Sequence, residues 1–375
     1  MTVEVDAARL DDVAALGAAD PGDMLRQVAA AAAQIREAQF RTAEAGIGAL
    51  AAGGRPRALV IAGMGASAIS GDVLAAVCGT GCPVPIVTVR GYRLPGWVGA
   101  ADLVIAVSRS GATEETLAVA AEAVRRGGRL LCVGAEGSPL ADIAAQASGL
   151  FVPVRSAGPP RAALWALTVP LILTARSLGI ADVSDDVLES TAQRLEEVSH
   201  RCRPSSESFI NPGKQLASEL GGALPMVWGT SPLAAVAACR FACQFNENAK
   251  YPCVYGALPD VAYHQVATLD GPFGGSEDDF FRDRADGGQG LHVIVLRDVE
   301  EHPEAVKQRE GSVELARARG IPVTEFMAEG AHPLERVATL IALADYTTVY
   351  LAIALGIDPT PVAAVQDLKA RTAGR

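Results

Sequence analysis

The sequence predicts an α/β protein built from two doubly wound units, each with a parallel sheet flanked by helices. Two observations carry this prediction. Short apolar runs alternate with segments of helical spacing, and the same plan occurs once before about residue 180 and again after it. The runs are apolar throughout rather than alternating, which is typical of strands buried on both faces of a sheet.

The first half opens with an alanine-rich segment, residues 8–52, whose apolar spacing predicts helix. The alternating pattern begins after it. The expected strands are 58–63, 84–89, 102–108, 129–134 and 150–154, and the expected helices are 67–77, 113–126, 140–147 and 161–178.

The second half follows a polar stretch, residues 182–212, in which a helix is expected over 185–202. The pattern then restarts. The expected strands are 225–229, 291–296 and 322–326, and the expected helices are 233–249, 303–319, 334–355 and 358 to about 373. At roughly 100–200 residues per domain, this length fits two domains, which we place at 1–188 and 189–375.

Charge narrows the classes of ligand. The chain has 32 basic and 43 acidic residues and a net charge of −11. Broad nucleic-acid binding needs a basic surface, so we expect no nucleic-acid partner. A small anion is not excluded, because a few backbone N–H groups and one or two cations hold a phosphate locally.

The cysteines and the N-terminus indicate a cytoplasmic protein. The seven cysteines form no CxxC pair, and Cys239 and Cys243, four residues apart, are read as small buried hydrophobes rather than half of a metal site. The segment Met1–Ala7 lacks the basic region and apolar core of a signal peptide. The apolar run Ala162–Ala175 is too short to span a bilayer, so no membrane association is expected.

Two expected strand-to-helix turns are candidates for phosphate binding. In the turn from Ser108 to Thr113, Ser108, Ser110 and Thr113 offer three hydroxyl groups around one glycine, at the start of a helix whose N–H groups are available. The alternative is that one hydroxyl caps the helix and the others are incidental.

The earlier turn, Gly63-Met-Gly65-Ala-Ser67, also follows a strand and opens a helix. Its glycines permit a sharp bend close to a ligand. It is not a GxGxxG motif, and the next strand ends at Arg90 rather than at an acidic residue, which speaks against a dinucleotide. A plain turn with Ser67 as the N-cap is the alternative.

Both turns together resemble the sugar isomerase (SIS) domain. Other segments resemble the bifunctional phosphoglucose/phosphomannose isomerases, from about Gly63 to Lys369. These segments are Pro160-Arg161, Asn211-Pro-Gly-Lys-Gln215, Phe245-Asn-Glu-Asn-Ala-Lys250, His264, Glu335-Arg336, Asp345–Leu351, Asp358–Val362 and Leu368-Lys369. The resemblance implies two flavodoxin-like SIS subdomains and an isomerase without metal or cofactor.

The resemblance also implies roles for individual residues. Phosphate ligands would be Gly65, Ser67, Ser108, Ser110 and Thr113. The catalytic base would be Glu247, the pair that opens the sugar ring His264 and Lys369, and the cation beside the reacting carbons Arg161. Thr360 is a candidate for substrate specificity. The resemblance further implies a homodimer whose active site lies at the interface, with the histidine supplied by the partner subunit.

The chain departs from the family pattern at five positions, among them Gln265, which follows His264 where asparagine is usual. Ala66 and Ala68 stand where glycine is usual, and we expect their methyl groups to narrow the approach of a phosphate and to remove access to positive φ. Ala112 stands where asparagine is usual, and Val266 where glutamate is usual. These changes are expected to affect substrate preference or activity.

The residue types suit aldose–ketose isomerisation. An acid and a base open the sugar ring, and imidazole titrates near neutral pH. A carboxylate then moves the proton between C2 and C1, while a cation stabilises the cis-enediolate. Each residue also has a plain structural alternative, such as a Glu247–Lys250 ion pair at i, i+3. A sugar-phosphate-binding regulator without catalysis, and an isomerase of another phosphosugar, remain alternative functions.

Overall fold

The computed structural model describes residues 5–155, 158–274 and 290–373. By internal contacts, these residues form two compact units. We call Ala29–Glu197 with Ala328–Thr339 the first-sheet unit. The second-sheet unit comprises the described residues within Met1–Val28, Val198–Met327 and Leu340–Arg375.

This division differs from the expected domains, 1–188 and 189–375, in three segments, which are the N-terminal segment, residues 189–197 and residues 328–339. The N-terminal segment groups with the second half, where the amide of Asp6 donates to the carbonyl of Ala354. Residues 328–339 group with the first half, where a ring nitrogen of His332 lies 3.1 Å from the carbonyl oxygen of Asp182. Long-range contacts of this kind leave no periodic signal in the sequence.

The first sheet has five parallel strands in the order β2-β1-β3-β4-β5, which is the flavodoxin-like order of a doubly wound sheet. The strands are β1 (Leu59–Ala62), β2 (Ile86–Val89), β3 (Leu103–Ser108), β4 (Arg129–Gly134) and β5 (Leu150–Pro153). All five coincide with expected strands. The central strands β1 and β3 are buried along their whole length, as their unbroken apolar runs predict.

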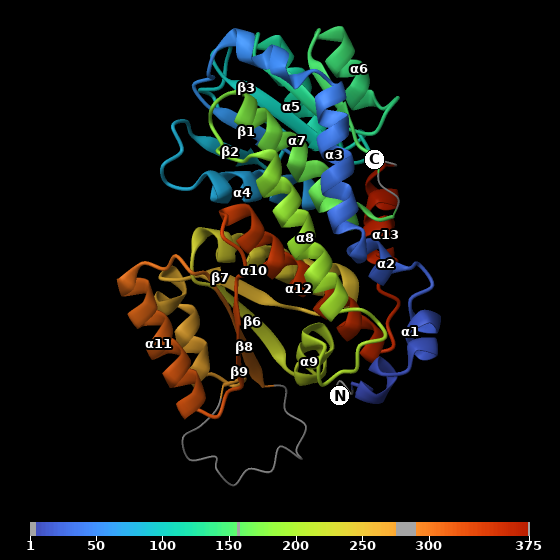
Figure 1. The fold of residues 1–375 in the computed structure, drawn as a ribbon, viewed down its shortest axis with the longest axis vertical. Coiled ribbons are helices and arrows are strands. Elements are labelled where there is room, and N and C mark those ends of the chain that lie inside the picture. Colours follow the sequence, from blue (N-terminus) through green and yellow to red (C-terminus); the bar gives the residue numbers. More distant parts are fainter. Residues whose placement is uncertain (1–4, 156–157, 275–289, 374–375) are drawn as a thin grey trace. The chain divides into compact units, whose positions relative to one another are not determined.

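Helices cover both faces of the first sheet (Figure 1). The elements are α3 (Ala31–Glu44), η2 (Ile47–Gly53), α4 (Ala66–Cys78), α5 (Glu114–Arg125), α6 (Pro139–Gln146), η3 (Pro160–Ala163), α7 (Leu164–Ser177) and α8 (Asp185–Arg201), which ends in the second-sheet unit. Helices α3, α4 and α7 pack together on one face, and α5 and α6 form a core with β1, β3 and β4 on the other.

The second sheet has four parallel strands in the order β7-β6-β8-β9. They are β6 (Leu224–Gly229), β7 (Val254–Ala257), β8 (Leu291–Arg297) and β9 (Val323–Met327). Three of them were expected, whereas β7 was not. Strand β7 is only four residues long and pairs with β6 alone, so its sequence lacks the long apolar run of a buried strand.

Helices again surround this sheet. The elements are η1 (Ala7–Leu10), α1 (Val13–Ala19), α2 (Met24–Ala29), α9 (Pro212–Glu219), α10 (Pro232–Gln244), a π-helix η4 (Phe245–Ala249), η5 (Asp260–Tyr263), η6 (Gln265–Asp270), α11 (Pro303–Ala318), α12 (Pro333–Ala354), which begins in the first-sheet unit, and α13 (Ala363–Ala373). Helix α10 contacts β6, β7 and β8, while α11, η5 and η6 share a core with β6 and β8.

The continuous helix expected over residues 8–52 is wrong, because the segment is divided into η1, α1, α2, α3 and η2. Asp12 accepts hydrogen bonds from the first N–H groups of α1, and Asp20 accepts from Met24 and Leu25 at the start of α2. Aspartate side chains that bond nearby N–H groups start new helices, and Pro21-Gly22 bends the chain before α2.

Helix α12 is the one helix among the described residues that is long and apolar enough to cross a membrane. Its apolar window is fully buried inside the protein. Thr347 and Thr348, both fully buried, add polar groups to this helix. The length and apolar character of α12 are therefore those of a core helix.

Candidate functional site

The hydroxyl groups of the turn between β3 and α5 converge. Ser108, the last residue of β3, is 1% exposed, and its Oγ lies 2.9 Å from Oγ1 of Thr113 and 3.4 Å from Oγ of Ser110. The amide of Ala112 donates to Ser110 Oγ at 3.3 Å. The three side chains proposed from the sequence therefore form one cluster of hydroxyl groups at the end of a central strand.

Gly111 gives this turn its shape. Its φ is +65°, and a Cβ atom at this position would lie 2.0 Å from Oγ of Ser138. The turn thus needs a glycine for two reasons, a left-handed backbone and a close neighbour. Ala112 has no positive φ and its side chain is exposed, so an alanine fits the backbone there.

The hydroxyl groups of this cluster do not cap helix α5 through its N-cap residue. Thr113 is the N-cap, and its side chain makes no capping hydrogen bond. The alternative in which one hydroxyl serves as the cap is therefore wrong for Thr113. By contrast, side chains cap α1, α6, α9, α10 and α11, and the capping residues are Asp12, Ser138, Asn211, Ser231 and His302.

The turn between β1 and α4 has the same property. Gly65, with φ of +53°, is the N-cap of α4, and no side chain caps this helix there. Ser67 lies inside the first turn and is 7% exposed, so the alternative with Ser67 as the N-cap is wrong. Ala66 and Ala68 are helical residues without positive φ; the expectation that these alanines remove needed backbone freedom is therefore also wrong.

The two turns lie at neighbouring positions of the sheet. Strands β1 and β3 are parallel neighbours, and Ala62 pairs with Ala106 near their carboxyl ends. From β1 the chain winds outward to β2, and from β3 it winds the other way to β4. This is the topological switch point of a doubly wound sheet, where ligands bind outside the carboxyl ends of the strands. Two helix N-termini without side-chain caps at this point suit an anion.

The corresponding place in the second sheet is closed by the protein's own groups. Ser231, after β6, caps α10 and donates to a carboxylate oxygen of Asp298 at 2.8 Å. Thr230 donates to Glu301 at 2.6 Å. Carboxylates from the end of β8 therefore accept the hydroxyl hydrogen bonds that a bound phosphate would accept in the first sheet. Of the two sheets, the first has the turns suited to a phosphate.

Arg161 belongs to the same unit as the phosphate turns. It lies in η3, is 2% exposed, and η3 packs against α3 and α4. A guanidinium taken this far out of water needs anionic or carbonyl partners. Arg109, inside the hydroxyl turn, is half-buried, and loss of hydration lowers the pKa of its guanidinium.

Glu247 lies at a local widening of the helix. Helix α10 passes at Phe245 into a π-helix that ends at Ala249, and Glu247 is half-buried at its centre. Single π-turns occur frequently at functional sites. Asn248 in the same turn donates to Oγ1 of Thr348 at 3.0 Å, which fixes the turn to α12.

Buried charges support the base of this π-helix. Arg240 makes two hydrogen bonds of 3.0 Å with the carboxylate of Asp345, and Gln244 donates to the same carboxylate at 2.9 Å. Arg240 is 1% exposed. The Asp345 segment, which resembles the family, therefore holds the helix that carries Glu247.

Lys250 follows the π-helix in a left-handed conformation, with φ of +53°. Its ammonium donates to the carbonyl oxygens of Asn248, Asp358 and Pro359 at 3.0, 2.9 and 3.2 Å. Sequence reasoning treated Lys250 only as a possible ion-pair partner of Glu247. The structure shows that it bonds to the loop before α13.

His264 lies at the surface of the second-sheet unit. It follows η5, its side chain is 54% exposed, and Nε2 lies 3.2 Å from a carboxylate oxygen of Asp260. Gln265 turns inward, accepting from Trp228 and donating to the carbonyl of Tyr255. Val266 packs on the core below, so the apolar residue at this position has a structural reason.

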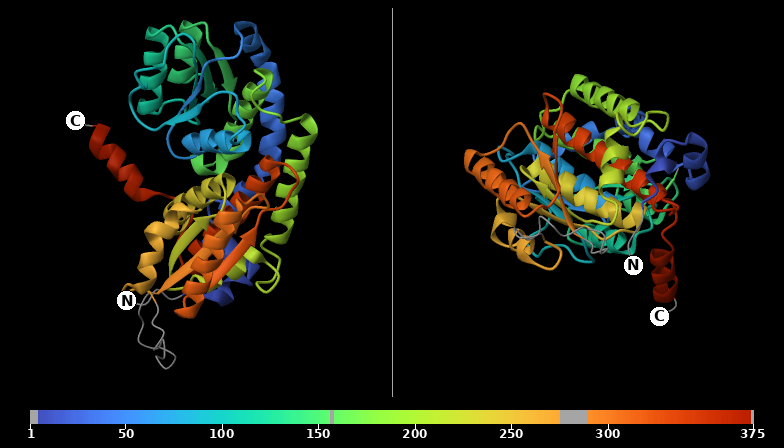
Figure 2. Two further views of the ribbon diagram at one scale, coloured as in Figure 1. Left: turned by 90° about the vertical axis from the view of Figure 1, so that its left-hand side faces the viewer. Right: turned by 90° about the horizontal axis from the view of Figure 1, so that it is seen from below.

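Lys369 and Thr360 lie on either side of the start of α13. Lys369 is exposed on α13, which Figure 2 shows extending away from the rest of the second-sheet unit. Thr360 Oγ1 is buried, and a Cβ atom at Gly22 would lie 2.2 Å from it. The structure thus brings Lys250 together with the loop before α13, and places Glu247, His264 and Lys369 on three separate elements.

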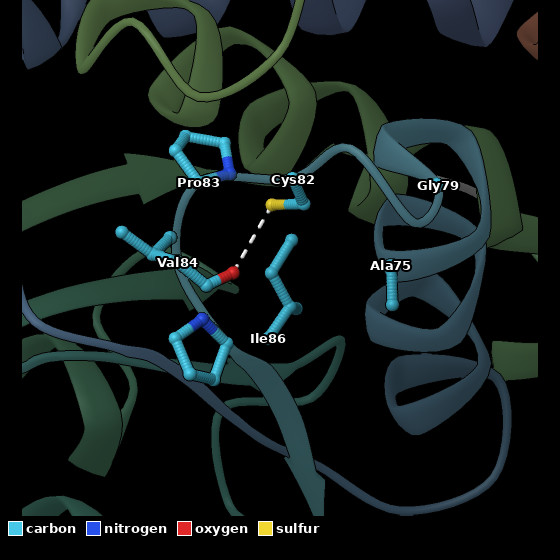
Figure 3. Close-up of a pocket in the computed structure, with 7 residues that line it drawn as sticks. Ala75, Gly79, Cys82, Pro83, Val84 and Ile86 are labelled. Atoms are coloured by element: carbon cyan, nitrogen blue, oxygen red, sulfur yellow. Dashed lines mark hydrogen bonds between the residues drawn. The ribbon is translucent and has the colours of Figure 1, made fainter.

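A cavity of about 380 Å³ lies beside the amino end of β2 in the first sheet (Figure 3). It is lined by Ala75, Gly79, Cys82, Pro83, Val84, Pro85 and Ile86. These residues are at the end of α4 and the start of β2, so this cavity is separate from the turns at the carboxyl ends of the strands. No group of three or more His, Cys, Asp or Glu side chains is arranged to hold a metal ion within residues 5–155, 158–274 and 290–373.

Known proteins are similar to this chain in sequence and in fold. Residues 209–372 match the family described as the bacterial phospho-glucose isomerase C-terminal SIS domain. A bifunctional phosphoglucose/phosphomannose isomerase of Caldicellulosiruptor bescii is 30% identical over 318 residues, which are 84% of this chain and 89% of that protein. One of Aquifex aeolicus is 28% identical over 314 residues, with the same shares covered.

A solved structure adds the fold alone. The crystal structure of a glucose-6-phosphate isomerase from Chlamydia trachomatis has a TM-score of 0.65 at 15% identity, covering 90% of this chain and 73% of that one. The doubly wound sheets and the serine-rich turns thus define a protein of the SIS class. Within that class, the chain belongs to the bifunctional phosphoglucose/phosphomannose isomerase family.

Proposed function

We propose that the chain interconverts glucose 6-phosphate, mannose 6-phosphate or both with fructose 6-phosphate. Relatives that match across 84% of the chain carry the name of this isomerase. The observation that carries the proposal is the cluster of Ser108, Ser110 and Thr113 at the switch point, beside two helix N-termini that no side chain caps. Hydroxyl groups and N–H groups in this arrangement match the oxygens of a phosphate monoester.

In this proposal the phosphate is the group by which the protein binds and orients the substrate. Gly65 and Ser67 would contact it from α4, and the hydroxyl cluster from the neighbouring turn. Binding energy from the phosphate, which does not react, holds the open-chain sugar in a reactive position. The phosphate ligands are thus expected to set KM and to contribute to kcat.

Proton transfer is assigned to groups without metal or cofactor. Glu247 takes the proton from C2 and returns it to C1, and Arg161 stabilises the charge of the cis-enediolate. His264 and Lys369 open the ring. Loss of the C2 proton makes C2 planar, so the two aldose phosphates, which differ only at C2, give the same enediolate, and one site could serve either of them. Thr360, half-buried and packed against Gly22, would affect specificity by shaping its loop.

We further propose that the active protein is a cytoplasmic homodimer with the active site at the subunit interface. The exposure of the His264 side chain supports this assignment, since a ring-opening group at the surface of one chain is available to a second copy. The departures at Ala112 and Val266 are then expected to alter the preference between substrates rather than to remove activity.

Glu247→Gln is the direct test. The amide keeps the size of the side chain but cannot take a proton at neutral pH, so kcat for fructose 6-phosphate should fall by at least about 100-fold. Binding of fructose 6-phosphate, measured by calorimetry, should stay within a few-fold of wild type. Glu304→Gln, on exposed α11, is the matched control and should turn over like wild type.

Two results would contradict the proposal. Turnover of Glu247→Gln at the rate of wild type would remove Glu247 as the base. A wild-type protein that binds fructose 6-phosphate without forming either aldose phosphate would instead indicate a sugar-phosphate-binding regulator. Assaying other phosphosugars in parallel, including amino sugar phosphates, tests for a different isomerase substrate.

A further inference from the structure

The backbone conformation of Lys250 costs free energy to maintain. Its φ of +53° and ψ of +33° lie in the left-handed region, which disfavours residues that carry a Cβ atom. Such conformations persist where surrounding contacts fix them, and they concentrate at functional sites. The three hydrogen bonds of the Lys250 ammonium are such contacts.

The ammonium group of Lys250 has three N–H bonds, and it donates to three carbonyl oxygens. One of these hydrogen bonds goes to Asn248, in the π-helix that carries Glu247. The other two go to Asp358 and Pro359, in the loop that leads to α13 and Lys369. Hydrogen bonds from a charged donor are stronger than neutral ones, so Lys250 joins the two segments firmly.

The loop that receives these bonds is fixed on its other side as well. The amide of Thr360 donates to a carboxylate oxygen of Asp358 at 2.9 Å. The side chain of Thr360 packs against Gly22 so closely that any Cβ there would overlap it. The loop therefore has one defined shape, and Lys250 connects that shape to the turn of Glu247.

We propose that Lys250 is a positioning residue that sets the Glu247 turn relative to the start of the helix bearing Lys369. The inference rests on the proposed isomerase function. In it, Lys250 touches no substrate. It aligns the residue that transfers the proton with the segment carrying the residue that opens the ring. A shift of about 1 Å in such an alignment costs on the order of 100-fold in rate.

The test compares Lys250→Met with two other variants. Methionine keeps a similar length and the same backbone strain but donates no hydrogen bond. Lys250→Arg keeps donors that reach carbonyl oxygens, and Lys307→Met removes an exposed lysine of α11. We expect kcat of Lys250→Met to fall about 10- to 100-fold with KM within about threefold, partial recovery in Lys250→Arg, and no change in Lys307→Met.

Two further measurements separate positioning from a loss of fold. With glucose 6-phosphate deuterated at C2, the isotope effect on kcat should rise in Lys250→Met, because a misplaced base makes proton transfer slower relative to the other steps. Amide hydrogen exchange should accelerate in residues 245–250 and 360–369 of that variant. Exchange accelerated throughout the chain, or a KM that rises with kcat unchanged, would overturn the proposal.

The outcomes also separate this inference from the proposed function. An inactive wild type would contradict the isomerase and, with it, a catalytic purpose for Lys250. An active wild type with a fully active Lys250→Met would overturn the positioning role alone. Exchange that rises at 245–250 but not at 360–369 would show that Lys250 does not couple the two segments.

Discussion

Hydroxyl side chains at the starts of helices perform two different tasks in this chain. Ser138 and Ser231 accept hydrogen bonds from helix N–H groups, which is ordinary capping. Ser108 instead lies across the turn from two other hydroxyl groups, 3.4 Å from Ser110 Oγ and 2.9 Å from Thr113 Oγ1. The side chain of Thr113, the N-cap residue of α5, makes no capping hydrogen bond, which suits the anion site proposed there.

At the scale of one residue, Gly111→Ala should damage this turn more than an ordinary glycine substitution. Positive φ costs an alanine about 1 kcal/mol, and the new Cβ would overlap Ser138, which typically adds about 1–3 kcal/mol. Gly127→Ala is the matched control, since Gly127 has φ of +68° and open space around its Cβ position.

Urea unfolding and steady-state kinetics check this prediction together. Gly111→Ala should lose about 2–4 kcal/mol of unfolding free energy and raise KM for fructose 6-phosphate, while Gly127→Ala should lose about 1 kcal/mol with KM unchanged. Equal losses and equal KM values in the two variants would show that the turn tolerates the Cβ atom and that its shape does not govern phosphate binding.

Sequence reasoning located the hydroxyl residues because their task depends on neighbours in the chain. A strand, a glycine and a helix within ten residues define the place of Ser108. The task of Lys250 could not be predicted in this way, because its partners Asp358 and Pro359 are more than 100 positions away in the sequence. The burial of Thr360 against Gly22 likewise depends on a tertiary contact that no local pattern records.

At the scale of elements, the strands were predicted best where both faces are buried. Strands β1 and β3 consist of apolar residues only over their buried length, apart from Ser108 at the end. Strand β7, which includes exposed Val254 and Tyr255, was missed. The single helix expected over 8–52 is too long, because Asp12 and Asp20 start new helices within this alanine-rich segment. The π-helix around Glu247 has no periodicity that distinguishes it from α10.

The start of strand β3 offers a test by pH. Asp102 is buried there, and its carboxylate accepts from Arg57 at 3.0 and 2.6 Å and from the amide of Gly99. The bond to Arg57 is the main cause that holds the pKa of Asp102 below its ordinary value of 3.8, against the opposing effect of burial. A carboxylate whose pKa is lower in the folded than in the unfolded chain stabilises the fold at pH values above its unfolded pKa. This contribution to the free energy of unfolding is lost as pH falls through the folded pKa.

Asp102→Asn should therefore be less stable than wild type at pH 7, by about 1–3 kcal/mol for a lost charged hydrogen bond. The difference should narrow as pH falls below 3.8, because Asp102 of the unfolded chain then binds a proton, and it should vanish once pH falls through the lower pKa of the folded state. Urea unfolding from pH 7 to pH 3 measures it, with exposed Glu304→Gln as the control. A difference that stays constant over this range would mean that the ionised carboxylate contributes nothing.

At the scale of the whole chain, two units of one plan have different tasks. The repeated pattern is visible in the sequence, and the order β2-β1-β3-β4 of the first sheet corresponds to β7-β6-β8-β9 of the second. The difference lies at the switch points. Hydroxyl groups face one another in the first sheet, whereas Asp298 and Glu301 accept from Ser231 and Thr230 in the second. Among the described residues, the two switch points thus differ in their side chains, and the proposed phosphate site is at that of the first sheet.

The proposal that two chains assemble the active site makes a quantitative prediction. If Glu247 of one copy works with His264 of another, then Glu247→Gln and His264→Ala are each inactive as homodimers but complement each other. In a mixed dimer, one of the two sites receives both intact residues. Random pairing makes half of the dimers mixed, so co-expression at equal levels should restore about a quarter of wild-type activity.

Tagging each variant with a different affinity tag and purifying through both tags isolates the mixed dimer, which should reach about half of wild-type activity. Size-exclusion chromatography with light scattering establishes that the sample is dimeric. A chain carrying both substitutions, paired with wild type, is the control: each of its two sites then has one defect, so activity should stay near zero. Activity in that control together with none in the complementing pair would show that His264 acts within its own chain, because only then does the wild-type copy keep a complete site.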